Sequence, residues 1–363
     1  MQLKKNILIC PLDWGLGHAT RCVPVISKLV EAGANVIIAS DNRPLAILRK
    51  EFPDLEYITF PGYNISYSSK KWMNIKMMFN APVILYKIYR ENRLLKKIIK
   101  KKQIHAVISD NRFGTWNKDI YSIYICHQLW VKIPGPFTFL EPVLYQLNHF
   151  FIRQYDQCWI PDYPGDNNLS GELSHFNNMP VNSGFIGPLS RFSMYRPKKT
   201  ATPKLDVAIV LSGPEPQRSL LEDKIMGQLV NSGIKAIVIR GVTEENSHRR
   251  IGNNIIVHSY LSTEKMLNEL EASSLVICRP GYSSIMDLAC LGIKALFIPT
   301  PGQTEQEYLA DYFYEKGIFL FKKQDDFNLL QDIPEALKFP GLNYTFDYTL
   351  LNDRINKLMA DCT

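Results

Sequence analysis

The chain has 363 residues, of which 46% are hydrophobic and 21% are charged, so it can bury a large core and is not a disordered polymer. Its length favours two domains. The formal net charge is +7, but 11 basic residues face a single acidic one between residues 70 and 102, so the excess charge is local.

The first predicted unit is a strand over residues 6–10, a glycine-containing loop, a helix and a second strand over residues 35–39. Gly15 and Gly17 lie in the loop after the first strand, where open α/β sheets bind their ligands. A third glycine is missing, since Thr20 stands at its position, so a dinucleotide site is not favoured. Pro11 interrupts the first apolar run, which therefore predicts a strand and not a signal peptide.

The basic block mixes apolar residues with lysine and arginine at helical spacing, a pattern found both in membrane-surface helices and in core helices with a solvated face. For residues 86–102 we favour the core helix. Lys70–Phe79 reads KKWMNIKMMF, and here contact with anionic lipid is an equal alternative. Few aromatic residues accompany the positive charge, so nucleic acid is not an expected partner.

Polar side chains follow four consecutive predicted strands, at residues 106–109, 121–126, 157–160 and 181–186. The carboxyl ends of parallel strands share one edge of a sheet, so these side chains are expected to line a cleft. Asp110, Arg112 and His127 are the candidate side chains in this cleft. A structural role for His127 remains an equal alternative.

After a polar, proline-bounded linker at residues 196–204, the α/β pattern restarts with a strand at 207–211 and the loop that begins Ser212-Gly213. The repetition predicts an α/β fold with two Rossmann-like domains whose parallel sheets face each other across a cleft. The expected boundaries are 1–195 for the N-terminal domain and 205–345 for the C-terminal domain. The segment 346–363 is expected to form a helix that packs back on the first domain.

The stretch Val276–Ala310 contains a strand that ends at Pro280-Gly281 and leads into a helix. The free N–H groups and the dipole of such a helix N-terminus form an anion site, and Ser283 and Ser284 open this helix. Asp287, one turn later, could accept hydrogen bonds from ribose hydroxyls. An ordinary strand–turn–helix unit is an equal alternative on these grounds alone.

The residues Arg279-x-Gly281, Asp287, Gly292 and Gln306 resemble the donor-binding signature of GT-B glycosyltransferases of the family-28 group, which add N-acetylglucosamine in peptidoglycan lipid synthesis. Gly15-x-Gly17-His18 is similar to the glycine-rich N-terminal loop of that group. The chain departs from the pattern at Asp287, where glutamate is usual, and at Pro214-Glu215-Pro216, which replaces small residues.

The resemblance implies the GT-B fold and transfer of a hexose or N-acetylhexosamine from a UDP-sugar to an acceptor hydroxyl, without a cofactor. It also implies that the acceptor, which could be lipid-linked, binds to the N-terminal domain and the donor to the C-terminal domain. On this basis we assign Asp110, Arg112 and His127 to the acceptor side. His18 is our leading candidate for the base and Asp13 the second, although His18 could instead be structural or position the acceptor. The expected donor-binding residues are Gly15, Gly17, Ser212, Gly213, Arg218, Arg279, Gly281, Ser283, Ser284, Asp287, Gln303, Gln306 and Glu307.

Retaining GT-B enzymes carry two glutamates eight positions apart in the donor stretch, where this chain has Arg279 and Asp287. Glu307 and Glu315 have the same separation, but Glu315 falls late in a helix pattern, so the reaction is expected to invert the anomeric centre. No Asp-x-Asp pair occurs in the chain, so no metal site is predicted. Two alternatives remain open: a UDP-sugar epimerase on the same scaffold, and a non-catalytic subunit that binds a nucleotide sugar and docks to a membrane partner. Scattered cysteines without a Cys-x-x-Cys pair and the lack of a bilayer-spanning apolar segment favour the cytoplasm, with peripheral contact at the inner face of the cell membrane as a further hypothesis.

Overall fold

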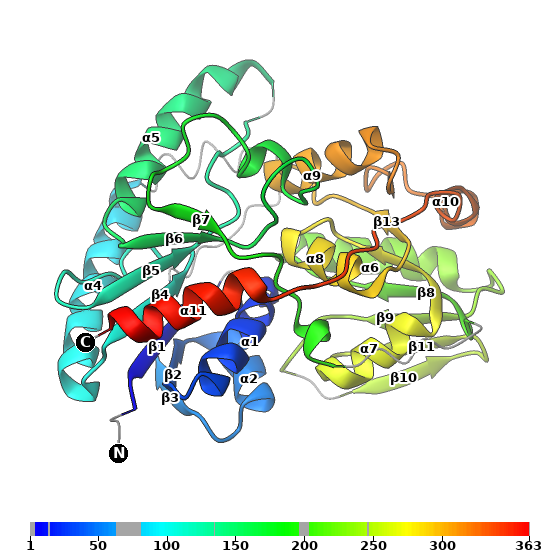
Figure 1. Ribbon diagram of the computed structural model, residues 1–363. Helices are drawn as coiled ribbons and strands as arrows, with labels where there is room; N and C mark the ends of the chain where they lie inside the picture. The colour runs from blue at the N-terminus through cyan, green and yellow to red at the C-terminus, as the bar shows by residue number, and fades with distance from the viewer. Residues whose placement is uncertain are drawn as a thin grey trace. The chain divides into compact units, whose positions relative to one another are not determined.

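The computed structural model describes residues 4–13, 15–62, 81–133, 135–195, 203–244 and 247–362. This part of the chain forms two compact units (Figure 1). Unit 1 contains the described residues up to Leu189 and those from Phe346 onward, and unit 2 contains the described residues from Ser190 to Thr345. Of the predicted linker at residues 196–204, positions 196–202 lie outside the described residues.

Unit 1 is built on a parallel sheet that has seven strands among the described residues, in the order β3-β2-β1-β4-β5-β6-β7. The strands are β1 (Asn6–Pro11), β2 (Asn35–Ser40), β3 (Glu56–Thr59), β4 (Ala106–Asp110), β5 (Tyr121–Ile125), β6 (Gln157–Ile160) and β7 (Ser183–Phe185). The order reverses between β1 and β4, and ligands of such sheets bind outside the carboxyl ends of the strands at this switch point.

Helices cover the sheet of unit 1, which is why its central strands are continuous apolar runs rather than alternating ones. The helices are α1 (Leu16–Glu31), α2 (Asn42–Glu51), α4 (Ala81–Lys102), α5 (Glu141–Ile152) and α11 (Thr349–Asp361), with the 3-10 turns η1 (Gly135–Leu140) and η2 (Gly171–Leu173). The helix α11 packs on α1, and Lys5 Nζ donates a hydrogen bond of 2.7 Å to the carbonyl of Met359 (Figure 1). Sequence-distant segments thus complete unit 1.

Unit 2 has a sheet of seven strands among the described residues, in the order β10-β11-β9-β8-β12-β13-β14. The strands are β8 (Leu205–Val210), β9 (Ala236–Ile239), β10 (His248–Ile251), β11 (Ile255–His258), β12 (Ser273–Cys278), β13 (Ala295–Phe297) and β14 (Leu320–Phe321). The helices are α6 (Gln217–Leu229), α7 (Thr263–Glu271), α8 (Tyr282–Leu291), α9 (Thr304–Glu315) and α10 (Leu329–Ala336), with the turn η3 (Arg191–Met194).

The sheet of unit 2 is not wholly parallel, which corrects the sequence-based expectation. The edge strand β10 pairs antiparallel with β11 through a short turn that contains Gly252 in a left-handed conformation (φ 58°). Only antiparallel strands can be joined by so short a connection. The remaining pairs are parallel. The switch point of unit 2 lies between β8 and β12.

Candidate functional site

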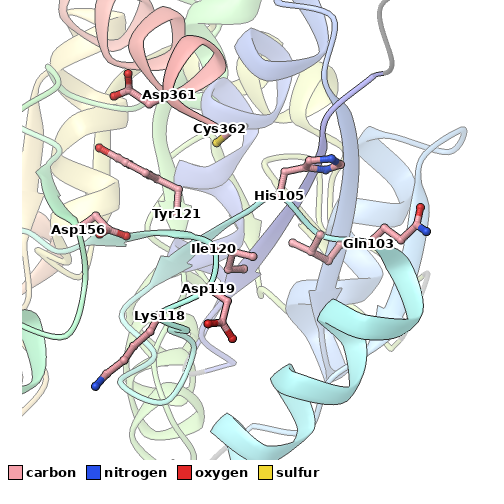
Figure 2. Close-up of a pocket in the computed structure, with 10 residues that line it drawn as sticks. Gln103, His105, Lys118, Asp119, Ile120, Tyr121, Asp156, Asp361 and Cys362 are labelled. Atoms are coloured by element: carbon pink, nitrogen blue, oxygen red, sulfur yellow. The ribbon is translucent and has the colours of Figure 1, made fainter.

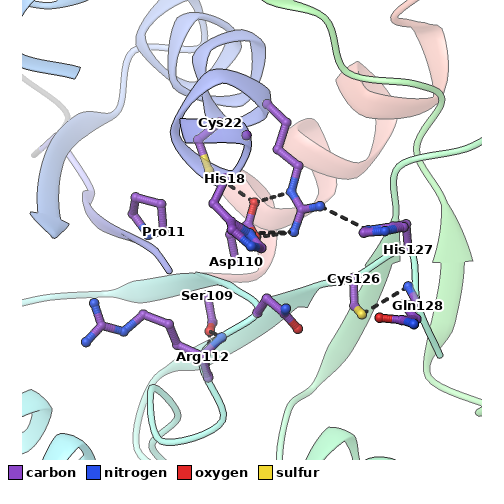
Figure 3. A network of polar contacts seen from close by, with 12 residues as sticks. Pro11, His18, Cys22, Ser109, Asp110, Arg112, Cys126, His127 and Gln128 are labelled. Atoms are coloured by element: carbon purple, nitrogen blue, oxygen red, sulfur yellow. Dashed lines mark hydrogen bonds and ion pairs between the residues drawn. The ribbon is translucent and has the colours of Figure 1, made fainter. Parts of the chain in front are cut away.

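A network of buried polar side chains lies at the switch point of unit 1 (Figure 3). The strands β1 and β4 pair so that Pro11 lies beside Asp110, the last residue of β4. The helix α1 begins at Leu16, and residues three or four positions apart share one face of a helix. His18, Arg21 and Cys22 therefore all reach Asp110.

Asp110 is the centre of this network and is fully buried. His18 Nδ1 lies 2.7 Å from its Oδ1, and Arg21 Nε donates to its Oδ2 at 2.5 Å. Arg21 Nη2 donates to Oδ1 as well, which makes the ion pair bidentate, and Cys22 Sγ lies 3.5 Å from Oδ2. A buried carboxylate is thus fully satisfied by a buried guanidinium and an imidazole.

The charges in the network determine where the proton of His18 lies. Burial opposes the ionised form of Asp110, but the adjacent Arg21 and His18 outweigh it and hold the pKa of this carboxyl well below its usual range. His18 Nδ1 lies 2.7 Å from the carboxylate, which only accepts hydrogen bonds, and 2.9 Å from Arg21 Nη2, which only donates them. The shorter contact to the ionised carboxylate favours the tautomer with the proton on Nδ1. The Nε2 atom then has the lone pair, and this is the atom that a general base needs.

His18 stays neutral at physiological pH. Burial and the nearby positive charge of Arg21 lower its pKa below 6.5, although Asp110 acts in the opposite direction. The side chain is 15% exposed, so it lies at the edge of the network and not in its interior.

Arg21 contacts both Asp110 and His127, and no role for it was predicted from the sequence. Its Nη1 lies 3.0 Å from His127 Nδ1. Arginine has no hydrogen-bond acceptor, so His127 Nδ1 must accept and its proton is on Nε2. The structure therefore brings together His18, Asp110 and His127 through a residue whose only sequence signal is its place one turn after His18.

Asp13 and Arg112 lie outside this network. Asp13 Oδ1 is buried without a partner among the described residues, and the carboxylate lies so close to Gly62 that no side chain would fit there. Arg112 is fully buried, donates to Glu91 Oε1 at 2.5 Å and to the carbonyls of Phe60 and Pro61, and is therefore a structural cation. This corrects its assignment to the acceptor side.

The predicted glycines of the N-terminal loop have backbone roles. Gly15 precedes α1 with φ 95°, a conformation that favours glycine, and Gly17 lies in the first turn of the helix. Both support the helix that presents His18.

In unit 2, three predicted donor-binding loops follow the adjacent strands β8, β12 and β13. Gly213 follows β8 with φ 101°, and a Cβ atom there would lie 3.6 Å from Thr300 Oγ1, so the loops after β8 and β13 meet at this point. Thr300 Oγ1 is buried and has no partner among the described residues. An unsatisfied buried hydroxyl at a strand end is a group that a ligand could bind.

The helix α8 begins directly after Gly281, and Ser283 and Ser284 lie in its first turn, half-buried. Its N-cap residue, Gly281, has no side chain that could cap the helix. Ser212 precedes Gly213 in the neighbouring loop and is also half-buried. The backbone N–H groups of the first turn of α8 therefore remain suited to an anion.

The two predicted arginines of unit 2 are engaged in the interior. Arg279 is fully buried and donates to the carbonyls of Ile298, Pro299 and Gln217 and to Gln324 Oε1. Burial lowers its pKa to about 10, which leaves it charged at neutral pH. The two Nη atoms thus fix the loop after β13, whereas Nε is buried without a partner among the described residues. The contact of Arg279 with a diphosphate stays a prediction.

Arg218 pairs with both neighbouring glutamates, Glu215 and Glu222, the latter at 2.9 Å. Its role as a counter-charge for a diphosphate likewise stays a prediction. Its charge is compensated within α6 and the loop before it.

The remaining predicted donor residues shape the loop after β13. Gln306 Oε1 accepts from the backbone N–H of Thr300 at 2.8 Å, and Glu307 Oε1 accepts from that of Gly302 at 2.9 Å. Gln303 precedes α9 as its N-cap residue without a side-chain cap. Gln306 and Glu307 thus fix the conformation of this loop through its backbone N–H groups.

Asp287 lies one turn into α8 and accepts a hydrogen bond of 2.6 Å from Ser190 Oγ. Burial raises the pKa of Asp287 to about 6, although Arg191 and the Ser190 hydroxyl lower it. A carboxylate held at such a pKa has few compensating partners, which is common where a ligand supplies them.

A cavity of about 450 Å³ in unit 1 lies at the opposite edge of its sheet from the network (Figure 2). His105 and Tyr121, which border the amino ends of β4 and β5, line it together with Asp361 and Cys362 of the C-terminal segment. Because open parallel sheets bind ligands at the carboxyl edge, this cavity is not the candidate site.

Comparisons with known proteins agree with the fold. Residues 221–342 match the glycosyltransferase family 28 C-terminal domain. A UDP-N-acetylglucosamine–N-acetylmuramyl-(pentapeptide) pyrophosphoryl-undecaprenol N-acetylglucosamine transferase of Haemophilus ducreyi is 26% identical over 166 residues, 43% of this chain and 45% of that protein. The chain therefore matches less than half the length of this relative. An uncharacterized glycosyltransferase of Methanosarcina acetivorans is 21% identical over 341 residues, 87% of this chain and 84% of that protein.

Among solved structures, the glycotransferase of kitacinnamycin has a TM-score of 0.63 at 16% identity, over 99% of this chain and 95% of that one. At this identity the likeness shows the fold alone. The predicted GT-B fold and the resemblance to family 28 are confirmed. The chain has the GT-B fold of the glycosyltransferase structures that it matches, and its residues 221–342 are similar to the glycosyltransferase family 28 C-terminal domain.

Proposed function

We propose that the protein transfers a hexose or N-acetylhexosamine from a UDP-sugar to an acceptor hydroxyl, with inversion and without a metal ion. The observation that carries this proposal is the buried Asp110–His18 pair, which holds the lone pair of a neutral imidazole on Nε2. In a glycosyltransferase scaffold, such an imidazole is suited to take the proton of an attacking hydroxyl.

In the proposed reaction the acceptor oxygen bonds to the anomeric carbon while its proton passes to His18 Nε2. The bond from that carbon to the diphosphate oxygen breaks, and its electron pair leaves with UDP. Asp110 orients the ring and stabilises the imidazolium that forms. Arg21 fixes Asp110 by a bidentate pair but also disfavours the imidazolium, so it keeps the base neutral before the reaction.

The donor is proposed to bind unit 2. The diphosphate would meet the N–H groups at the start of α8, and the loop of Gly213 and Thr300 would supply further donors. Asp287 would accept hydrogen bonds from the ribose. Since Arg279 and Arg218 are engaged elsewhere, the charge of departing UDP would be stabilised mainly by preorganised backbone groups. The Haemophilus ducreyi relative, by its name, uses UDP-N-acetylglucosamine, which supports a UDP-sugar here.

A lipid-linked acceptor is part of the proposal, since the same relative is named for a pyrophosphoryl-undecaprenol substrate. The segment Lys70–Phe79 lies outside the described residues. On α5, however, Val143, Leu147 and Phe150 are 62%, 52% and 60% exposed and lie on one face. Within the described residues, no helix combines the length and hydropathy needed to cross a bilayer.

The helix α4 adjoins this apolar face, because Ile84 and Ile88 of α4 share a cluster with Phe151 of α5. Eight lysines and arginines lie on α4, and its one acidic residue, Glu91, is buried against Arg112. An apolar face beside a helix that carries so much positive charge suits the surface of an anionic membrane.

The test of the proposed reaction is turnover of a panel of radiolabelled UDP- and GDP-sugars. Slow release of free sugar from a UDP-sugar supports a transferase, release of an epimer supports the epimerase alternative, and binding without turnover supports the non-catalytic alternative. His18→Ala should abolish release, whereas His248→Ala, an exposed histidine on β10, should not change it. Equal activity of His18→Ala and the unchanged protein would refute the assignment of the base.

A further inference from the structure

A second cavity of unit 1, of about 430 Å³, lies on the same edge of the sheet as the His18 network. Its walls come from the loop after β5, the segment after β6 and the first residue of α5. Trp130, which lines it, follows His127 by three residues on the loop after β5. The cavity has the size of an ordinary small-ligand site and adjoins the segment that carries a member of the network.

One wall of this cavity is aromatic and held in place. The ring of Trp130 stacks on that of Tyr145 at 5.1 Å and meets that of Phe176 at 5.4 Å and 60°. Trp130 Nε1 donates to Glu141 Oε2 at 2.8 Å, and the Tyr145 hydroxyl donates to the carbonyl of Asn178 at 2.8 Å. Trp130 and Tyr145 are thus each fixed by a polar contact at the ring edge, which leaves little rotamer entropy to lose on binding.

The other wall is polar and carries more negative than positive charge. Lys132 pairs with Glu172, whose side chain is 68% exposed, and lies 4.0 Å from Glu141. Asn177 adds an exposed amide. His175 also lines the cavity, and its Nε2 lies 2.8 Å from the carbonyl oxygen of Tyr163. The two carboxylates outnumber the one ammonium, which disfavours a phosphate or any other anion.

We propose that this cavity binds an uncharged saccharide ring of the acceptor. The apolar C–H face of a pyranose packs on an aromatic side chain, while its hydroxyls bond to carboxylate, ammonium and amide groups, and the cavity offers both walls. Because the cavity carries more negative than positive charge, any diphosphate of the acceptor would lie outside the cavity. This inference rests on the proposed function, and it names the part of the acceptor that would lie nearest to the base.

The direct test is tryptophan fluorescence of the full chain titrated with methyl β-D-glucopyranoside, N-acetylglucosamine, glucose 6-phosphate and, as a polyol control, glycerol. A neutral sugar should give a saturable change at millimolar concentration, and glucose 6-phosphate and glycerol should not. In Trp130→Phe, which keeps an aromatic ring against Tyr145, the change should disappear. Absence of a saturable change with either neutral sugar, or tighter binding of glucose 6-phosphate, would overturn the inference.

A second measurement does not depend on the fluorescence of Trp130. Glu172→Gln retains shape and hydrogen-bonding capacity, and Glu172→Lys reverses the charge of a largely exposed side chain. By calorimetry, Glu172→Lys should admit glucose 6-phosphate, while Glu172→Gln should still prefer the neutral sugar. If both variants bind all four probes as the unchanged protein does, the polar wall does not recognise the ligand.

Release of sugar from a UDP-sugar in the absence of acceptor separates this inference from the proposed function. Trp130→Phe should raise the KM of an accepted sugar by about tenfold, because phenylalanine has a smaller ring face and no indole N–H to hold Glu141. Sugar binding without any turnover of UDP-sugars would refute the function and retain the cavity. If the protein transfers sugar from a UDP-sugar to an added sugar, and Trp130→Phe does not change the KM of that added sugar, the proposed function stands and the cavity is not the acceptor site.

Discussion

Replacing Asp287 by asparagine should stabilise the protein at neutral and alkaline pH. Burial raises the pKa of this carboxyl from 3.8 to about 6, so the folded state binds a proton more tightly than the unfolded state does. The stability of the unchanged protein therefore falls as the pH rises from about 4 to 6. Each pKa unit is worth about 1.4 kcal/mol, which gives a cost of about 3 kcal/mol above pH 6, or about 1–3 kcal/mol after screening by solvent at this half-buried site.

The assay is urea unfolding of both proteins at pH 4.5 and at pH 8. The asparagine side chain would still accept the hydrogen bond from Ser190 through its amide oxygen, so only the charge is removed. The variant should be more stable at pH 8 by about 1–3 kcal/mol and by only about a third of that amount at pH 4.5, while Asp353→Asn, an exposed control on α11, should change stability by less than about 0.5 kcal/mol. A difference that is absent at pH 8, or equal at both pH values, would refute the reasoning.

The same variant should bind its UDP-sugar about tenfold or more weakly, because a charged acceptor for the ribose is lost. A gain in stability with a loss of donor affinity would show that the carboxylate is kept for the ligand and not for the fold. A variant that is more stable and binds the donor equally well would exclude Asp287 from the donor site.

The network, the buried ion pair and the apolar face each allow a further prediction. The acidic limb of the pH–rate profile should lie below pH 6.5, because the pKa of His18 is lowered by burial and by Arg21; a limb above about 7 would contradict a neutral His18. Glu91→Gln should lower the free energy of unfolding by about 3–5 kcal/mol in urea, because it leaves the buried Arg112 without its counter-charge; a cost below about 1 kcal/mol would mean that the pair is well solvated. Phe150→Ser should reduce co-sedimentation with phosphatidylglycerol vesicles, whereas Leu330→Ser, at an equally exposed apolar position on α10, should not; equal losses would place the lipid contact elsewhere.

Much of the fold could be predicted because parallel strands buried on both faces are continuous apolar runs, and each is followed by polar residues at the ligand edge. The edge strand β10 was missed because His248, Arg249 and Arg250 are exposed and give no apolar signal. Strand order could not be derived either, since it depends on which helices cross which face. The sequence thus predicts the elements more readily than their pairing.

The site was predictable by residue type at Asp110 and His127, which follow strand ends, but not at Arg21. A charged residue inside a helix is usually solvated, and nothing in its spacing shows that it is buried. The converse error occurred at Arg112, which also follows a strand but turns inward to carbonyls and a glutamate. The charge of a residue can be read from the sequence, whereas its burial depends on residues that are distant from it in the sequence.

The helix α11 has a consequence for how the protein is made. It belongs to unit 1, although it is synthesised after unit 2. Unit 2 can therefore fold on the ribosome while α1 still lacks the helix that packs on it, and Gly184 of β7 still lacks the guanidinium of Arg354 that lies over it. The first unit to begin folding is the last to be completed, so the helix that presents His18 gains its full support only when α11 has been made.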